Sequence, residues 1–117
     1  MTSTPHKPGA TIIQLHGDID IFSSEAMRRR LLAALPTSES TLICDLSDIS
    51  FRDMSGFGVL VGIQRRARAM DIVLALTRPS THTRDLLHMT GLEWSLPVYR
   101  HGQVDAASHM EVVPNTR

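Results

Sequence analysis

Short apolar runs alternate with amphipathic segments along this chain of 117 residues. Residues 11–16 and 41–46 have the pattern of strands, and residues 72–76 are apolar at every position, which is typical of a strand covered on both faces. Apolar side chains recur at helical spacing over residues 23–35 and 57–70. Strands that alternate with helices indicate an α/β layer fold with a largely parallel sheet.

The C-terminal third of the chain predicts three further elements. A helix that begins at Ser80 is expected to end at Gly91, a residue that suits a left-handed cap. Residues 94–98 then alternate as a strand, and Pro97 places that strand at a sheet edge because proline has no amide donor. Residues 103–110 are predicted to form a short last helix.

The composition fits one globular domain without a charge surplus. Of the residues, 42% are hydrophobic and 21% are charged, and 12 basic side chains balance 12 acidic ones. Nucleic-acid binding rests on a basic surplus, so we do not expect it here. We expect a flexible leader at residues 1–10, a domain over residues 11–110 and a flexible tail at residues 111–117.

Further features of the sequence indicate a cytoplasmic protein without a cofactor. Cys44 is the single cysteine, which excludes an internal disulfide and is typical of a reducing compartment. Residues 1–10 contain no signal-peptide pattern, and no apolar run approaches the ~20 residues of a membrane-spanning helix. The six histidines show no paired spacing, so the sequence predicts no metal site.

The segment around Ser55 has the features of a helix start that can be modified. Ser55 precedes the helix of residues 57–70, where its hydroxyl is expected to accept a hydrogen bond from a helix amide. A helix N-terminus also accommodates phosphate, because its free amides and its dipole favour negative charge. Right-handed crossovers place the loops that follow parallel strands at one end of the sheet. Residues 18–20 and 52–55 follow strands, so the sequence predicts that they meet.

Phosphorylation of Ser55 would add about −1.5 to −2 charges and three acceptor oxygens to this surface. The same surface is expected to carry Asp18, Asp20 and Asp53. A partner that docks there would meet a dianion in place of a small hydroxyl. We therefore predict a switch that works by steric and electrostatic exclusion, with little change in the fold.

Four motifs stand in register along the chain. They are Gly17-Asp18-Ile19-Asp20, Asp45-Leu46-Ser47, Phe51-Arg52-Asp53-Met54-Ser55-Gly56-Phe57-Gly58-Val59-Leu60 and Leu86-Leu87-His88-Met89-Thr90-Gly91-Leu92. Together they resemble the STAS family, specifically its bacterial anti-sigma factor antagonists, across residues 11–110. The resemblance implies a mixed, mostly parallel sheet of four to five strands, with about four helices packed mainly on one face.

The resemblance also implies a regulatory role without enzymatic activity, in which Ser55 is the phosphorylated residue. Unphosphorylated protein would bind an anti-sigma factor that is itself the serine kinase, supplies ATP and magnesium, and then releases its sigma factor. A separate protein phosphatase would restore Ser55. Asp20 matches the family's carboxylate beside the phosphorylation loop and is predicted to contact the partner. The predicted partner-binding residues are Asp20, Asp53, Met54, Gly56, Phe57 and Gly58.

Three departures from the family pattern bear on the partner surface and on the edge of the sheet. Met54 replaces the family's first serine or threonine, which leaves Ser55 as the acceptor. Phe57 replaces a leucine and places a bulkier apolar residue near the docking site. The family's first strand has no clear counterpart in residues 1–10, so the sheet edge there is expected to be short or absent.

Two alternatives to the sigma switch stay open. A hydrolase with Ser55 as its nucleophile is disfavoured, because its turn requires glycine where this chain has Asp53 and Phe57. The candidate bases for such a hydrolase, none of them marked by spacing, are His16, His82, His88 and His101.

The second alternative uses the same fold for another role. The chain would be a free-standing regulatory subunit of a transporter ATPase, or a scaffold in a stress-signalling assembly.

Overall fold

The computed structural model describes residues 10–100 and 111–113, in which five strands form one sheet. The strand order is β4-β3-β2-β1-β5, and every registered pair of neighbours is parallel. The elements are β1 (Ala10–Ile19), α1 (Ser24–Ala34), a 3₁₀ helix (Leu35–Thr37), β2 (Thr41–Phe51), α2 (Ser55–Ala69), β3 (Val73–Thr77), α3 (Thr81–Thr90), a second 3₁₀ helix (Leu92–Trp94), β4 (Val98–Tyr99) and β5 (Glu111–Val113).

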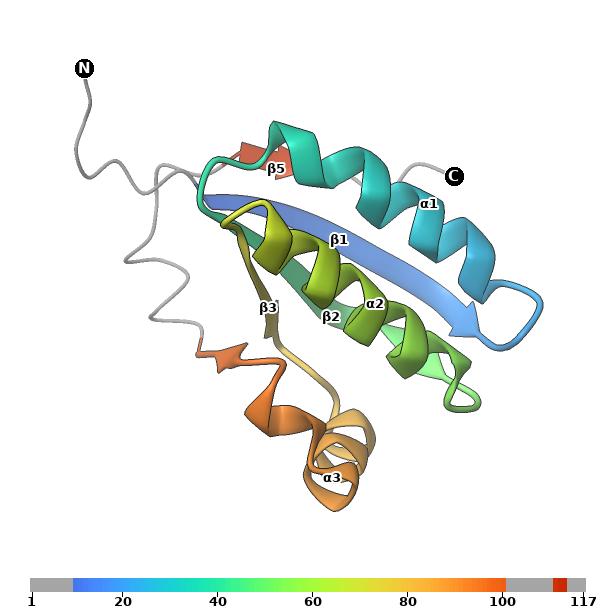
Figure 1. The fold of residues 1–117 in the computed structure, drawn as a ribbon. Coiled ribbons are helices and arrows are strands. Elements are labelled where there is room, and N and C mark those ends of the chain that lie inside the picture. The colour runs from blue at the N-terminus through green and yellow to red at the C-terminus, as the bar shows by residue number, and fades with distance from the viewer. Residues whose placement is uncertain (1–9, 101–110, 114–117) are drawn as a thin grey trace.

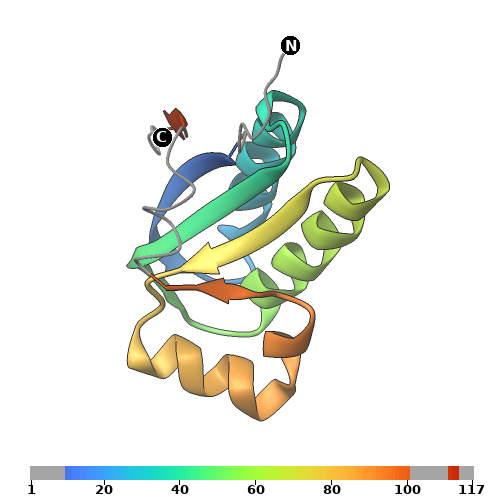
Figure 2. The same ribbon diagram turned by 90° about the vertical axis from the view of Figure 1, so that its left-hand side faces the viewer.

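Helices α1 and α2 lie side by side over one face of the sheet (Figure 1), and α3 lies beyond β4, at that edge of the sheet (Figure 2). This arrangement confirms the predicted α/β class. The described strands pair without an antiparallel neighbour, whereas the family resemblance implied a mixed sheet. The reason is that α1, α2 and α3 each carry the chain back before the next strand, as parallel pairing requires. Among the described residues, no helix has the length and apolar content to cross a bilayer.

The larger core lies between the helices and the sheet. Leu31 of α1, Leu60 of α2, Leu42 and Leu46 of β2, and Leu76 of β3 are all 0% exposed. Complete burial of a leucine side chain contributes about 1.5–3 kcal/mol relative to exposure. These residues therefore hold α1 and α2 against the strands whose ends carry the candidate site.

A smaller apolar cluster covers the opposite face of the sheet and consists of Ala10, Ile43 and Ala75. Successive side chains along a strand point to opposite faces, so Cys44, which follows Ile43, packs into the larger core. Burial raises the pKa of the Cys44 thiol to about 12. The thiol is therefore protonated at neutral pH and packs as a small apolar group.

Strands β1 and β2 are longer than the sequence pattern predicted. Their pairing continues from His16 opposite Asp48 to Ile19 opposite Phe51, after a register shift between Gln14 and His16. Gly17 has a φ of 107°, a conformation that suits glycine, and lets β1 continue beyond the shift. Residues 18–19 and 48–51, which the sequence pattern places in the loops of residues 18–20 and 48–54, are therefore the last residues of two strands.

The segment after α3 differs from its prediction. Gly91 ends the helix with a φ of 75°, which confirms the predicted left-handed cap. The strand expected over residues 94–98 is reduced to Val98–Tyr99, because the amides of Ser95 and Leu96 donate back to the carbonyl of Leu92 at 3.0 and 2.9 Å. β4 lies at the sheet edge, as Pro97 indicated.

Two predictions concern the C-terminal part of the chain. The short helix expected over residues 103–110 lies outside the described residues. Residues 111–113, assigned to the tail, form β5, which pairs with Thr11–Ile13 of β1. Three α-helices are therefore described, against about four expected.

Candidate functional site

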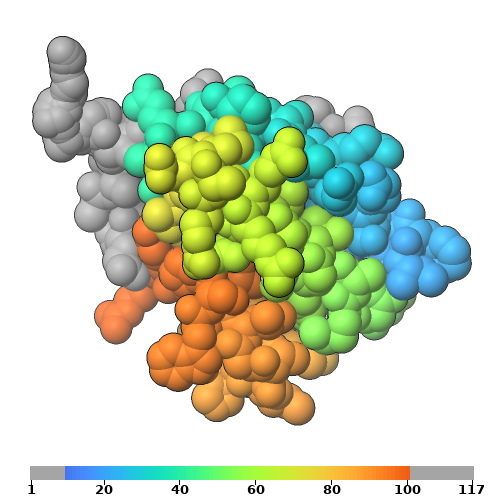
Figure 3. Space-filling view, viewed as in Figure 1, coloured from blue at the N-terminus to red at the C-terminus, as the bar shows by residue number. Residues whose placement is uncertain are grey.

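The loops that follow β1 and β2 meet at one end of the sheet, as predicted. The amide of Arg52 donates to the carbonyl of Ile19 at 2.8 Å, and the amide of Ile21 donates to Oδ2 of Asp53 at 3.2 Å. The guanidinium of Arg52 lies 3.6 Å from the carboxylate of Asp18. The space-filling view shows the two loops adjoining at the surface, in blue and green (Figure 3). Residues more than 30 positions apart are thus held together.

The first loop, residues 20–23, is organised by Asp20. Its Oδ1 accepts hydrogen bonds from the amides of Phe22 at 2.9 Å and Ser23 at 3.1 Å. The Ser23 hydroxyl accepts from the amide of Asp20 at 2.9 Å and lies 3.0 Å from the carbonyl oxygen of Asp18. This side-chain turn is typical of aspartate before a helix. Asp20 therefore shapes the loop that leads into α1, whatever contact it makes with a partner.

Ser55 is the first residue of α2, and Met54 occupies the N-cap position. Asp53 caps the helix start, because its Oδ1 accepts from the amide of Ser55 at 2.8 Å and from the Ser55 hydroxyl at 2.5 Å. The expectation that the hydroxyl accepts a bond from a helix amide is therefore wrong. The hydroxyl donates to Asp53, a better acceptor, and the Ser55 side chain is half-buried at the surface.

The hydrogen bonds at Asp53 also set its charge. The Ser55 hydroxyl, and next the Ser55 amide, lower the pKa of the Asp53 carboxyl from its usual range. Hydrogen bonds to the charged form of a carboxylate always act in this direction. At neutral pH an ionised carboxylate therefore holds the hydroxyl proton of Ser55. The lone pairs of Oγ are left free for an incoming electrophile.

We expect the stability of the start of α2 to decrease at acidic pH. The depressed pKa of Asp53 means that its stabilising effect is present above the unfolded-state value and is lost as the pH falls through the lower, folded-state value. Carboxyl ¹³C chemical shifts followed by NMR from pH 6 to pH 2, a range of roughly four units around the reference value of ~3.9, measure this pKa. Ser55→Ala is expected to move it back toward the usual range. An unchanged Asp53 titration in Ser55→Ala would show that the hydroxyl is not its partner.

The structure separates the remaining predicted site residues into two groups. Met54 is 48% exposed, and Gly58 is open to solvent with no atom within 4 Å of the position that a Cβ would take. Gly56 is buried, and Phe57 is 1% exposed with its ring stacked on Phe51 at 4.5 Å between centroids. The prediction that the Phe57 side chain contacts the partner is therefore corrected, because its ring is buried in the core.

Two exposed apolar residues beside this site were not predicted. Ile21 is 64% exposed and Phe22 is 87% exposed, and both belong to the loop that Asp53 holds. Large exposed apolar groups in one place are typical of interaction sites. The sequence signal that could have revealed this exposed pair is its position between two polar residues, Asp20 and Ser23, in a short loop before a helix. We call Ile21, Phe22, Asp53, Met54 and Ser55 the docking face.

Asp45, in the second of the four motifs, has a structural role. Its carboxylate is buried and accepts from the guanidinium of Arg78 at 2.6 Å and from the amide of Ser47 at 3.0 Å. Burial alone would raise the pKa of Asp45, but the hydrogen bonds from Arg78 and Ser47 offset this and lower it. The pair ties the middle of β2 to the residue that follows β3.

No group of three or more His, Cys, Asp and Glu side chains among the described residues is arranged to hold a metal ion. Two of the histidines considered as hydrolase bases contact acidic residues elsewhere. His16 lies 4.0 Å from Asp48, and His88 lies 2.8 Å from Glu93.

Comparison with known sequences finds one family and named relatives. The family model of the STAS domain matches residues 1–104. A protein of Paenibacillus polymyxa named anti-sigma F factor antagonist is 28% identical over 109 residues, which cover 92% of each chain. A protein of Bacillus subtilis strain 168 named anti-sigma-B factor antagonist is 30% identical over 81 residues, which cover 69% of this chain and 73% of the relative.

Comparison with solved structures finds the same fold. An anti-sigma factor antagonist from Mycobacterium paratuberculosis superposes with a TM-score of 0.70 at 23% identity, covering 89% of this chain and 86% of that one. The unphosphorylated form of the antagonist SpoIIAA superposes with a TM-score of 0.68 at 22% identity, covering 91% and 93% of the two chains. At these identities the likeness establishes the fold and leaves the partner to be argued from the site.

Proposed function

The chain belongs to the STAS domain family, and from this premise we propose that it is an anti-sigma factor antagonist controlled by phosphorylation of Ser55. In its unphosphorylated form it binds an anti-sigma factor through the docking face and so frees a sigma factor. The names of the Paenibacillus and Bacillus relatives support this role. The anti-sigma factor is also the serine kinase, and a phosphatase reverses the modification, all within the cytoplasm.

The single observation that carries the proposal is the position of the Ser55 hydroxyl. It lies at the start of α2 and at the surface, with its proton held by Asp53 and with Ile21, Phe22 and Met54 exposed nearby. Apolar side chains at the centre of a contact supply most of the affinity in typical interfaces. A hydroxyl among them is available to a kinase that binds the same face.

The chain itself acts as the phosphate acceptor, and the kinase supplies the chemistry. The Ser55 oxygen attacks the γ-phosphorus of ATP, the new O–P bond forms, and the bond to the leaving ADP oxygen breaks. The hydroxyl proton departs along its hydrogen bond toward Asp53 and then to solvent. The phosphatase hydrolyses the ester and restores the hydroxyl.

Intact mass spectrometry tests the proposal directly. Purified protein is incubated with ATP, magnesium and each anti-sigma-factor kinase encoded by the source genome, and the modified residue is mapped. We expect a single phosphate on Ser55 with one of these kinases and none on Ser55→Ala. Phosphorylation at another residue, or complete inertness toward every kinase that binds the protein, would contradict the proposal.

Phe22 is expected to be the main apolar contact of the docking face. Phe22→Ala removes a side chain that is 87% exposed and contacts little in the free protein, so folding should be unchanged. Affinity for the anti-sigma factor should fall by about thirtyfold, because an aromatic hot spot is worth ~2 kcal/mol or more. Calorimetric titration measures the change.

Trp94→Ala provides the matched control for Phe22→Ala. Trp94 is 86% exposed, but it lines a hollow with Asp71 and Val73 at the start of β3, the end of the sheet away from Ser55. Its loss should leave the affinity unchanged. A larger effect from Trp94→Ala than from Phe22→Ala would move the interface to the other end of the molecule.

A further inference from the structure

Helices α1 and α2 carry an excess of positive charge, although the whole chain has a formal net charge of zero. Each helix contains three arginines, and Glu25 is the only acidic residue of the two helices. The exposed arginines are Arg28, Arg29, Arg65, Arg66 and Arg68. The outer faces of both helices lie at the surface, in cyan and yellow-green (Figure 3). A partner that covers these helices therefore meets a positively charged surface.

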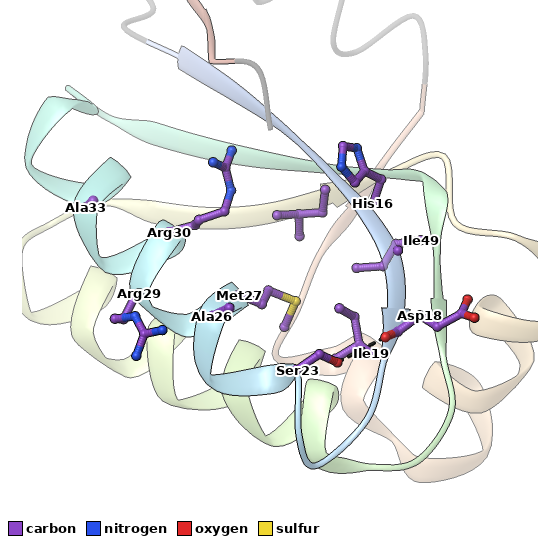
Figure 4. A pocket seen from close by; sticks show the side chains of 12 residues that line it. His16, Asp18, Ile19, Ser23, Ala26, Met27, Arg29, Arg30, Ala33 and Ile49 are labelled. Atoms are coloured by element: carbon purple, nitrogen blue, oxygen red, sulfur yellow. Dashed lines mark hydrogen bonds between the residues drawn. The ribbon is translucent and has the colours of Figure 1, made fainter. Parts of the chain in front are cut away.

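A hollow of about 380 Å³ lies between α1 and α2, and we call it the interhelical groove. Arg28 and Leu32 line it from α1. The other side of α1, with Ala26 and Ala33, borders a separate cavity against β1 (Figure 4). The residues that line the groove from α2 are Ser55, Gly58, Val59, Gly62, Ile63 and Arg66. Because Ser55 belongs to the docking face, the groove continues that face along the two helices.

Two glycines line the groove, and the packing of the described residues does not explain them. Gly58 and Gly62 are exposed, and nothing lies within 4 Å of the position that a Cβ would take at either residue. Neither glycine has a positive φ. Glycine inside a helix destabilises it relative to alanine. The glycines therefore lower the stability of α2 without a gain in packing, whereas a partner backbone could approach closely where no side chain projects.

Apolar side chains and arginines complete the groove. Leu32 of α1 and Val59 of α2 are half-buried and offer apolar surface. Arg66 forms no ion pair with a carboxylate of the described residues. Arg28 lies 3.2 Å from Glu25, but the two side chains are 49% and 57% exposed, and such surface ion pairs contribute little. Both guanidinium groups are therefore available to the carboxylates of a partner.

We propose that the interhelical groove binds an acidic amphipathic helix of the anti-sigma factor, so the inference rests on the proposed function. Apolar side chains of that helix pack on Leu32 and Val59, and its backbone approaches the two glycines. Its carboxylates pair with Arg28 and Arg66, as charge complementarity at an interface favours. α2 rises about 16 Å from Ser55 to Arg66 at ~1.5 Å per residue, so a partner helix of about three turns fills the groove.

Two other anionic partners fit this surface less well. A helix that lies on an anionic bilayer inserts large apolar side chains, and the exposed large apolar residues of the described chain all lie outside α1 and α2. A single-stranded nucleic acid stacks its bases on aromatic side chains. Phe57 is the one aromatic residue of α1 and α2, and it is 1% exposed. An acidic helix therefore agrees best with the apolar sides and open glycines of the groove.

Charge reversal tests the pairing with Arg66. Unphosphorylated anti-sigma factor is titrated by calorimetry into the full chain. Arg66→Glu should weaken binding by roughly tenfold or more, and the loss should shrink as the salt concentration rises, because salt screens exposed charges. Arg84→Glu makes the same change at an exposed position of α3, outside the groove, and should bind as the wild type does. Equal affinities of the two variants would overturn the proposal.

Filling the groove tests the role of the glycines. Gly62→Leu places an apolar side chain where the partner backbone would approach, and it raises the helix propensity, so the fold should be kept. Binding should weaken by roughly tenfold or more, because the added side chain clashes with the partner. Ala69→Leu adds the same side chain at the end of α2, outside the groove, and should bind normally. Equal affinities of Gly62→Leu and Ala69→Leu would contradict the proposal.

Compensating substitutions identify the element of the partner. Each acidic residue on the helices of the anti-sigma factor is replaced by arginine in turn. One replacement should restore the binding of Arg66→Glu, and failure of all of them would overturn the assignment to an acidic helix. The assignment would also be overturned if phosphatidylglycerol vesicles or single-stranded RNA bound in an Arg66-dependent way and more tightly than the anti-sigma factor.

The oligomeric state separates the anti-sigma factor from a second copy of the chain. If the wild-type protein were a dimer and Arg66→Glu made it a monomer, the groove would be an interface between copies, and the proposal would be wrong. Failure of the proposed function has a different signature, in which the wild type binds no anti-sigma factor. If the wild type bound, Ser55→Asp did not, and both groove variants bound normally, only the groove would be rejected.

Discussion

Ser55→Asp is expected to lower the affinity of the protein for its anti-sigma factor by about a hundredfold, whereas Ser55→Ala retains the affinity. A carboxylate placed at Ser55 stands beside the ionised Asp53 and is repelled toward the docking partner. Unpaired charge buried in an interface typically costs ~2–5 kcal/mol, which sets the size of the loss. Ser55→Ala keeps the backbone amide that donates to Asp53, so the start of α2 is preserved.

The measurement is calorimetric titration of each variant against the unphosphorylated partner. Circular dichroism and thermal unfolding should be the same for both variants, because negative charge at a helix N-terminus is well tolerated. Ser40→Asp adds the same charge at an exposed position just before β2, at the other end of the sheet, and should bind normally. If Ser55→Asp bound as tightly as Ser55→Ala, the switch by exclusion would be refuted.

Gly56→Ala is expected to destabilise the protein by ~2–3 kcal/mol, the cost of overpacking a filled core. A Cβ at Gly56 would lie 2.5 Å from Cδ1 and 2.7 Å from Cε1 of the Phe51 ring. That ring has little room to yield, because it is 4% exposed and stacks on Phe57. A loss of stability is unusual for this substitution, since alanine in a helix normally stabilises a protein relative to glycine.

Gly58→Ala is the matched control for Gly56→Ala. It lies in the same turn of α2, but nothing lies within 4 Å of its added Cβ. Gly58→Ala should therefore stabilise the protein by about 0.5–1 kcal/mol, the usual gain from glycine to alanine in a helix. Urea unfolding monitored by circular dichroism measures both changes. Equal stabilities of the two variants would mean that the Phe51 ring moves aside without cost.

Patterns of side-chain type predicted much of the architecture. Alternation of strands and helices predicts the α/β class, and the rule for parallel crossovers places residues 18–20 beside residues 52–55. Gly91 was identified as a left-handed cap because few other residues adopt that conformation without strain. These features depend on periodicity or on one residue's local preference, both of which are present in a sequence.

The details of the site depended on contacts between distant residues. The sequence places Ser55 at a helix start, but only the fold shows that Asp53 accepts its proton while also binding the amide of Ile21. Phe57 is predicted to contact the partner because the family resemblance places it near the docking site. Its ring turns inward because the buried face of α2 begins there. Phe22 was missed because exposure of an aromatic residue in a short loop cannot be read from periodicity.

The two oxygens of Asp53 accept hydrogen bonds from different loops, and this would give the proposed phosphorylation of Ser55 a second route of action. Oδ1 holds the hydroxyl and amide of Ser55, while Oδ2 holds the amide of Ile21. Esterification of the hydroxyl removes one donor and sets a dianion against the same carboxylate. The tether on Ile21 should then weaken, so the backbone that leads to Phe22 is held less firmly. One acidic side chain would thus relay the chemical state of a helix start to a neighbouring loop.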